Sequence, residues 1–103
     1  MARAFLSLGS NMGDRLKNIQ QAVGLLAMSP KINIIKTSSF YETEPWGNKK
    51  LDWFLNAALA LDTSLSCMDL LKLCQSVENQ LGRKRNPNEG WQNRLIDIDI
   101  LMY

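Results

Sequence analysis

The sequence predicts an α+β domain built from an antiparallel sheet with two helices on one face. Strand-like segments and two segments of helical periodicity follow one another in the order β-α-β-β-α-β. That order is the ferredoxin-like, split βαβ arrangement. A length of 103 residues with 46% apolar content fits one core, so we expect a single domain over residues 1–103.

The first half of the chain is predicted to form a strand, a helix and a second strand. Residues 2–8 are strand-like and run into Gly9-Ser10-Asn11, a cluster of turn formers where the strand should stop. Over 14–28 an apolar stripe recurs at helical spacing, formed by Leu16, Ile19, Val23 and Leu26, and Pro30 marks the end of that helix. Residues 32–41 are β-branched and aromatic, which predicts the second strand.

The second half is predicted to form a strand, a helix and a last strand. Residues 53–63 are strand-like. Ser66 opens a Ser-x-x-Asp sequence typical of a helix start, and Gly82 is suited to end the helix over 66–81. Residues 95–103 alternate between apolar and polar, as a half-buried strand does.

Composition and charge exclude several classes of protein. Twelve Lys and Arg residues against ten Asp and Glu residues create no general basic field, so we expect no nucleic-acid partner. The start resembles no signal peptide and no run of eighteen apolar residues occurs, so we expect a cytoplasmic protein without a membrane partner.

The absence of histidine argues against zinc sites and histidine-based triads. Cys67 and Cys74 lie about 10 Å apart on one helix, too far for a disulfide, and are expected to be packing residues. The oligomeric state is left open.

The last strand carries the strongest chemical signal. Alternation over 95–101 sends the isoleucines to one face and Asp97 and Asp99 to the other. Two carboxylates about 6.6–7 Å apart on one face suit one or two Mg²⁺ ions that also bind substrate phosphates. The alternative is a half-exposed strand whose polar face carries two aspartates.

The segment before this strand is basic and contains an aromatic residue. Its cations are Arg83, Lys84, Arg85 and Arg94. The guanidinium group of arginine matches phosphate oxygens with paired donors. Together with the two aspartates they predict a Mg-nucleotide site, although solvated charge is the alternative. Trp91 lies in the same segment and is expected either to cover a ligand or to pack over the sheet.

A second group combines aromatic rings with an amide, around a loop that contains Pro45 and Gly47. Stacking rings and the amide of Asn56 suit a planar heterocycle, although core packing is the alternative for any single ring. The aromatic residues are Tyr41, Trp46, Trp53 and Phe54. The turn over 9–14 lacks the Gly-Lys-Ser/Thr ending of a nucleotide loop, and a strand-to-helix turn explains most of it.

Five motifs, taken together, resemble hydroxymethyldihydropterin pyrophosphokinase over nearly the whole chain. They are Gly9-Ser10-Asn11-Met12-Gly13, Ser38-Ser39-Phe40-Tyr41-x-Thr43, Phe54-Leu55-Asn56-Ala57-Ala58, Gly82-Arg83-x-Arg85 and Arg94-x-x-Asp97-x-Asp99. The resemblance implies transfer of the terminal diphosphate of ATP, the co-substrate, to the hydroxymethyl group of a reduced pterin, with release of AMP.

The resemblance also implies roles for individual residues. Asp97 and Asp99 would hold two magnesium ions. Arg83 and Arg94 would stabilise phosphates, and Arg85 with Trp91 would belong to a closing loop. Glu78 and Ile100 would lie on the nucleotide side. The residues that match the pterin pocket are Thr43, Pro45, Trp46, Gly47, Phe54 and Asn56.

The chain departs from the family pattern in three respects, and two other functions compete with catalysis. Gln92-Asn93 stands where the family usually has Gly-Pro, one extra residue lies between Arg85 and Trp91, and the sequence ends at Tyr103, before the family's C-terminal segment. A non-catalytic module that binds a nucleotide or a pterin is the first alternative. An RNA-binding sheet domain is the second, but it would place two carboxylates where phosphates should lie.

Overall fold

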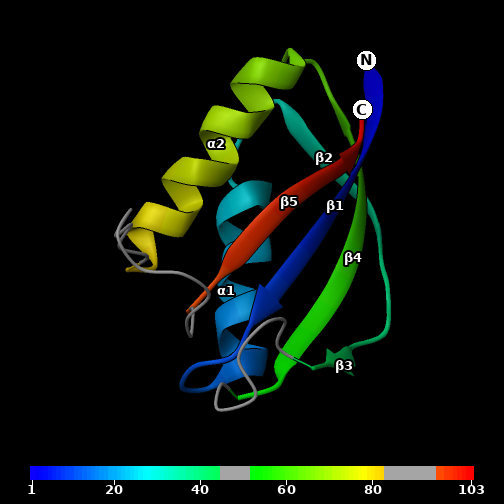
Figure 1. Cartoon of the computed structure of the whole chain (residues 1–103). Helices are drawn as coiled ribbons and strands as arrows, with labels where there is room; N and C mark the ends of the chain where they lie inside the picture. The colour runs from blue at the N-terminus through cyan, green and yellow to red at the C-terminus, as the bar shows by residue number, and fades with distance from the viewer. Residues whose placement is uncertain (45–51, 83–94) are drawn as a thin grey trace.

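The computed structural model, which describes residues 1–44, 52–82 and 95–103, has both helices on one face of an antiparallel sheet (Figure 1). The strand order is β2-β4-β1-β5, and the short β3 also pairs with β4. This arrangement confirms the predicted α+β, ferredoxin-like fold. The elements are β1 (Ala2–Ser10), α1 (Arg15–Ala27), β2 (Ile32–Thr37), β3 (Tyr41–Thr43), β4 (Phe54–Thr63), α2 (Cys67–Gln80) and β5 (Asp97–Met102).

The segment predicted as one strand over 32–41 is two strands, β2 and β3, that pair with successive parts of β4. Between them, the backbone N–H of Ser38 donates to the carbonyl of Ala58 at 2.8 Å. The Ser38 hydroxyl accepts from the backbone N–H of Ala58, also at 2.8 Å. Because the side chain takes the place of a backbone acceptor, regular pairing stops here while the two strands stay connected to β4.

The first strand extends further than the sequence indicates. Gly9 and Ser10 belong to β1 and not to the following turn. The reason is the central position of β1, because Gly9 is paired with Asn56 of β4 on one side and with Asp97 of β5 on the other. Ladders on both sides therefore override the local turn preference of these residues.

The core lies between the sheet and the helices. Alternate residues of β1, β4 and β5 face the helices, and the buried stripe of each helix covers them. Leu16, predicted to belong to the stripe of α1, is 42% exposed, so that prediction is wrong for this residue. The buried apolar residues are Ala4, Leu6, Leu8, Ile19, Ala22, Leu26, Ile32, Ala57, Leu59, Leu61, Leu70, Cys74, Val77, Ile96 and Ile98.

Capping side chains begin both helices. The Asp14 carboxylate accepts from the backbone N–H of Lys17 at 3.1 Å, and the Ser66 hydroxyl accepts from that of Asp69 at 3.1 Å. After α2, Gly82 has a φ of 95°, which confirms its predicted role as a terminator. Within the described ranges, neither helix has the length and apolar character needed to cross a membrane.

Candidate functional site

The face of the sheet turned away from the helices brings residues from four strands into rows. Directly paired residues of antiparallel strands share a face. One row runs Asp97, Gly9, Asn56 and Tyr41 across β5, β1, β4 and β3. At strand spacings of about 4.8 Å, the Cα atoms of Asp97 and Asn56 are about 10 Å apart, a span that suits a small ligand.

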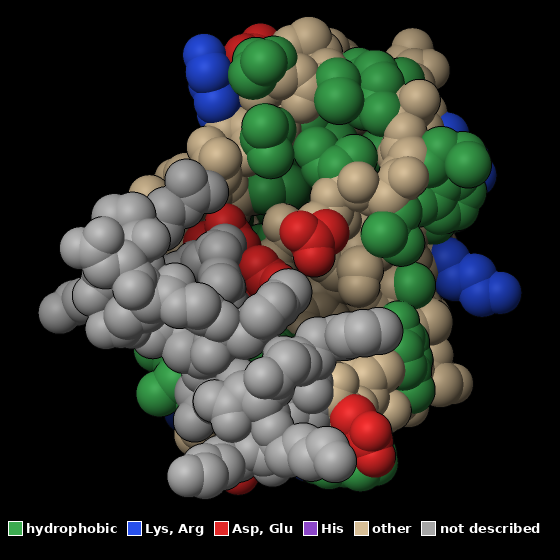
Figure 2. Space-filling model, viewed as in Figure 1, with side chains coloured by type: hydrophobic (Ala, Val, Ile, Leu, Met, Phe, Trp, Pro, Cys, Tyr) green, Lys and Arg blue, Asp and Glu red, His purple; other side chains and the backbone are tan. Residues whose placement is uncertain are grey.

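Asp97 and Asp99 both lie on this open face, as the alternation predicts. Asp97 is half-buried and Asp99 is exposed, whereas Ile98 between them is buried in the core. Asp99 is paired with Ser7 of β1, in the row next to that of Asp97. Figure 2, in the orientation of Figure 1, shows Asp and Glu side chains gathered near the middle of the surface.

The oxygen chemistry of this pair fits Mg²⁺. The two carboxylates project from the same side of one strand, about 6.6–7 Å apart at Cα, and hard oxygen ligands are those that Mg²⁺ prefers. Across residues 1–44, 52–82 and 95–103, no group of three or more His, Cys, Asp or Glu side chains is arranged to hold a metal ion. Two carboxylates that leave other positions to substrate oxygens match the usual mode of Mg²⁺ binding.

The amide of Asn56 is held in one orientation. Its Nδ2 donates to the Thr43 hydroxyl at 2.8 Å and lies 3.4 Å from the carbonyl oxygens of Tyr41 and Phe54. Carbonyl oxygens only accept, so the NH₂ group must occupy this side. The carbonyl oxygen of the amide, Oδ1, is therefore directed over Gly9 and presents an acceptor on the open face.

Gly9 makes room for that acceptor. A Cβ atom at this position would lie 2.8 Å from Asn56 Oδ1 and 3.4 Å from Cδ1 of the Phe54 ring. A side chain of any size here would therefore displace the amide. A glycine inside a strand often marks such a close approach, and this signal becomes visible only once β1 is seen to include Gly9.

Glu78 and Ile100, by contrast, do not join the open face. Glu78 of α2 is 3% exposed, and its Oε2 accepts from the backbone N–H of Ile98 at 2.9 Å. Among the described strands β5 lies at the edge of the sheet, so this bond satisfies an N–H that no described strand pairs with on that side. Ile100 is partly buried against the core. Both residues support β5 from the helix side of the sheet.

Cys74 does not have the features of a nucleophile. Cys74 is fully buried, and this burial, with the Glu78 and Asp99 carboxylates, raises the pKa of its thiol to about 12. A thiol with that pKa is protonated at neutral pH, and thiolate is the reactive form. Both cysteines are free, with Cys67 exposed, so no disulfide forms between them, as predicted.

The structure therefore brings Asp97 and Asp99 onto one face with Asn56, and Asn56 into contact with Thr43 and next to Phe54. Of the other residues predicted for the site, Tyr41 and Trp53 are each about half exposed. The remaining ones lie outside the described residues. They are Pro45, Trp46, Gly47, Arg83, Lys84, Arg85, Trp91 and Arg94.

Comparisons with known proteins show which family this chain resembles. Residues 5–103 match the family model described as 7,8-dihydro-6-hydroxymethylpterin-pyrophosphokinase. Three relatives carry the name 2-amino-4-hydroxy-6-hydroxymethyldihydropteridine pyrophosphokinase. The protein of Methylorubrum extorquens is 48% identical over the whole chain and 64% of its own length. The Bacillus subtilis protein is 44% identical over 97% of this chain and 59% of its own length. The Porphyromonas gingivalis protein is 43% identical over 100% of this chain and 70% of its own length. The chain spans less than two thirds of the length of the first two.

Proposed function

This chain belongs to the 7,8-dihydro-6-hydroxymethylpterin-pyrophosphokinase family, and from that premise we propose that it pyrophosphorylates a reduced pterin in folate biosynthesis. The hydroxymethyl oxygen of the reduced pterin forms a bond to the β-phosphorus of ATP. The bond between that phosphorus and the oxygen of the α-phosphate breaks. AMP leaves with this oxygen, and the hydroxyl proton is released.

The pairing of two carboxylates with an oriented amide on one open face carries this proposal. Asp97 and Asp99 would hold two magnesium ions, which when bound neutralise the charge of the triphosphate. Asn56 Oδ1, about 10 Å away across the sheet, would accept a hydrogen bond from an N–H donor of the heterocycle. Nucleotide and pterin would then meet above β1, which lies between the strands that carry Asn56 and Asp97.

The protein's own contribution on the pterin side is orientation. The Thr43 hydroxyl fixes the Asn56 amide through the bond of 2.8 Å, and the adjacent Phe54 ring offers a stacking surface. An amide held in one rotamer loses little entropy when it binds a ligand, so recognition gains in both affinity and specificity. By resemblance to the family, Pro45, Trp46 and Gly47 would complete this pocket.

On the nucleotide side we propose roles that rest on the family resemblance. Arg83 and Arg94 would bind phosphate oxygens, and Arg85 with Trp91 would close over the assembled substrates. The resemblance assigns Glu78 and Ile100 to the nucleotide side, but both lie on the helix side of the sheet, so we propose that they act on the nucleotide site through β5. The bond of Glu78 to the Ile98 N–H supports an indirect role, in which it holds β5 and so keeps Asp97 and Asp99 in place.

The experiment incubates the protein with MgATP and the reduced hydroxymethylpterin, and measures AMP. Asp97→Asn and Asp99→Asn should each reduce AMP formation by at least about 100-fold, since each removes a charge that would hold the metal. Asp69→Asn is a matched control, because Asp69 is exposed on α2, remote from β5's open face, and should leave the rate unchanged.

Three results would count against the proposal. ADP as product would indicate transfer of a single phosphoryl group. Binding of pterin and nucleotide without AMP would favour a non-catalytic module. Full activity in either Asp97→Asn or Asp99→Asn would refute the metal assignment.

A further inference from the structure

Arg15, the first residue of α1, reaches both ends of the segment that links β3 to β4. Its Nη2 donates to Oε1 of Glu42 in β3 at 2.7 Å. Its Nη1 donates to the backbone carbonyl of Trp53, immediately before β4, at 3.0 Å. One guanidinium therefore joins the end of β3 to the beginning of β4. The planar fork of arginine is suited to such paired bonds.

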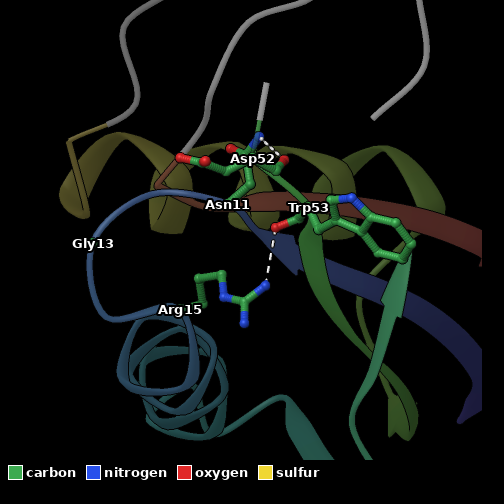
Figure 3. A pocket seen from close by; sticks show the side chains of 5 residues that line it. All are labelled: Asn11, Gly13, Arg15, Asp52 and Trp53. Atoms are coloured by element: carbon green, nitrogen blue, oxygen red, sulfur yellow. Dashed lines mark hydrogen bonds between the residues drawn. The ribbon is translucent and has the colours of Figure 1, made fainter. Parts of the chain in front are cut away.

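These bonds span a hollow. Arg15 and Trp53, with Asn11, Gly13 and Asp52, line a pocket of about 310 Å³ between the β1–α1 turn and the chain entering β4 (Figure 3). Asn11 supplements the connection, because its Nδ2 donates to the Asp52 carbonyl at 3.0 Å. Where a pocket replaces close packing, the relative position of the two walls depends on the polar bonds that cross it.

The turn that holds Arg15 is itself well fixed. The Asn18 side chain donates to the Met12 carbonyl at 2.8 Å and to the Ser10 hydroxyl at 3.1 Å, and Asp14 caps the helix. The polar groups of the turn are thus bonded within the turn or to the chain before β4. A scaffolding role agrees with the strand-to-helix turn that the sequence predicts here, in preference to a nucleotide loop.

The position of β3 and β4 matters for the open face because side chains alternate along a strand. Glu42 points to the helix side, where Arg15 holds it, and Thr43 is the next residue, on the open face. The Thr43 hydroxyl in turn accepts from Asn56 Nδ2 at 2.8 Å. A shift of β3 relative to β4 would therefore move Thr43 away from the amide that it orients.

We infer that Arg15 is a positioning residue for pterin binding, acting from the helix side of the sheet through Glu42 and Trp53 on the Thr43–Asn56 pair. This inference rests on the proposed function. Arg15 itself needs no contact with either substrate. Its ion pair with Glu42 is partly exposed, and such pairs contribute little to global stability. Loss of Arg15 should therefore appear in ligand affinity more than in the thermal midpoint.

The test compares Arg15→Ala with Arg15→Lys and with a control, Arg3→Ala. Arg3 forms a partly exposed ion pair with Asp62 near the opposite end of β1. Arg15→Ala should raise both the dissociation constant and the KM for the reduced hydroxymethylpterin by roughly tenfold, with KM for ATP changed less than about twofold. Arg15→Lys should lie between, since one ammonium replaces a two-armed donor. Arg3→Ala should change neither constant.

Double substitution separates positioning from general destabilisation. If Arg15 acts through Glu42, the double variant Arg15→Ala/Glu42→Ala should lose less pterin affinity than the sum of the losses in the two single variants. Unchanged pterin affinity in Arg15→Ala would overturn the inference. Equal losses for pterin and ATP, accompanied by a lowered thermal midpoint, would also overturn it.

A second measurement is independent of turnover. Hydrogen exchange of the backbone amides of 41–43 and 54–56 should be faster in ligand-free Arg15→Ala than in the unsubstituted protein, and unchanged in Arg3→Ala. If the unsubstituted protein forms no AMP, the proposed function fails, but this exchange still reports whether Arg15 holds β3 to β4. Equal exchange in Arg15→Ala and the unsubstituted protein would show that Arg15 does not hold β3 to β4.

Discussion

Replacement of Gly9 by alanine tests the open face with the smallest possible change. The new Cβ would lie 2.8 Å from Asn56 Oδ1, closer than a carbon and an amide oxygen approach without repulsion. It would also lie 3.4 Å from Cδ1 of Phe54, which is ordinary contact. The amide, and not the ring, must therefore move by several tenths of an ångström.

The cost follows from the bonds that fix the amide. Asn56 is held by the Thr43 hydroxyl at 2.8 Å, so its oxygen cannot withdraw from β1 without loss of this bond or of the acceptor position on the open face. Loss of one oriented hydrogen bond to a ligand costs about 1–3 kcal/mol. The dissociation constant of the pterin should therefore rise roughly fivefold to 150-fold.

The assay measures pterin binding through tryptophan fluorescence, and nucleotide binding with an ATP analogue that carries a methylene group between the α- and β-phosphorus. Gly24→Ala is the matched control, since Gly24 is exposed on α1 and a Cβ there meets no atom within 4 Å. It should stabilise the protein by up to about 1 kcal/mol and leave both affinities unchanged.

Normal pterin affinity in Gly9→Ala would refute the reasoning, because the close contact would then have no consequence for recognition. Parallel losses of pterin and nucleotide binding, with a reduced thermal midpoint, would show a damaged fold instead. Only a selective loss of pterin affinity fits the geometry of Gly9 and Asn56.

Three further predictions concern Thr43 and the cysteines. Thr43→Val should weaken pterin binding several-fold because it leaves the Asn56 amide without its hydroxyl partner, whereas Thr43→Ser should retain most of the affinity; equal affinities in the two variants would contradict the orienting role. In the folded protein at pH 8, iodoacetamide should modify the exposed Cys67 and spare Cys74, whose thiol has a pKa of about 12, and rapid labelling of both would contradict the burial. In the unfolded chain the Cys74 thiol ionises near pH 9.0, whereas in the folded protein it stays protonated to about pH 12. The free energy of unfolding should therefore fall as pH rises from about 9 towards 12.

The sequence alone determined the features that depend on local periodicity. Alternation over 95–101 separates Asp97 and Asp99 from the isoleucines, and the structure has Ile96 and Ile98 in the core. Asp14 and Ser66 indicate the helix starts because a capping side chain bonds to the backbone within its own turn. Such signals need no knowledge of the rest of the chain.

Which residues become neighbours was decided only by the tertiary structure. Gly9, Asn56 and Asp97 form one row because of the register of three strands, and a slip of one residue would turn every side chain of a strand to the other face. Local pattern does not encode register. Local pattern also does not indicate the role of Arg15, which in sequence is an ordinary helix residue. Its contacts with Glu42 and Trp53 exist only because the start of α1 lies beside the ends of β3 and β4.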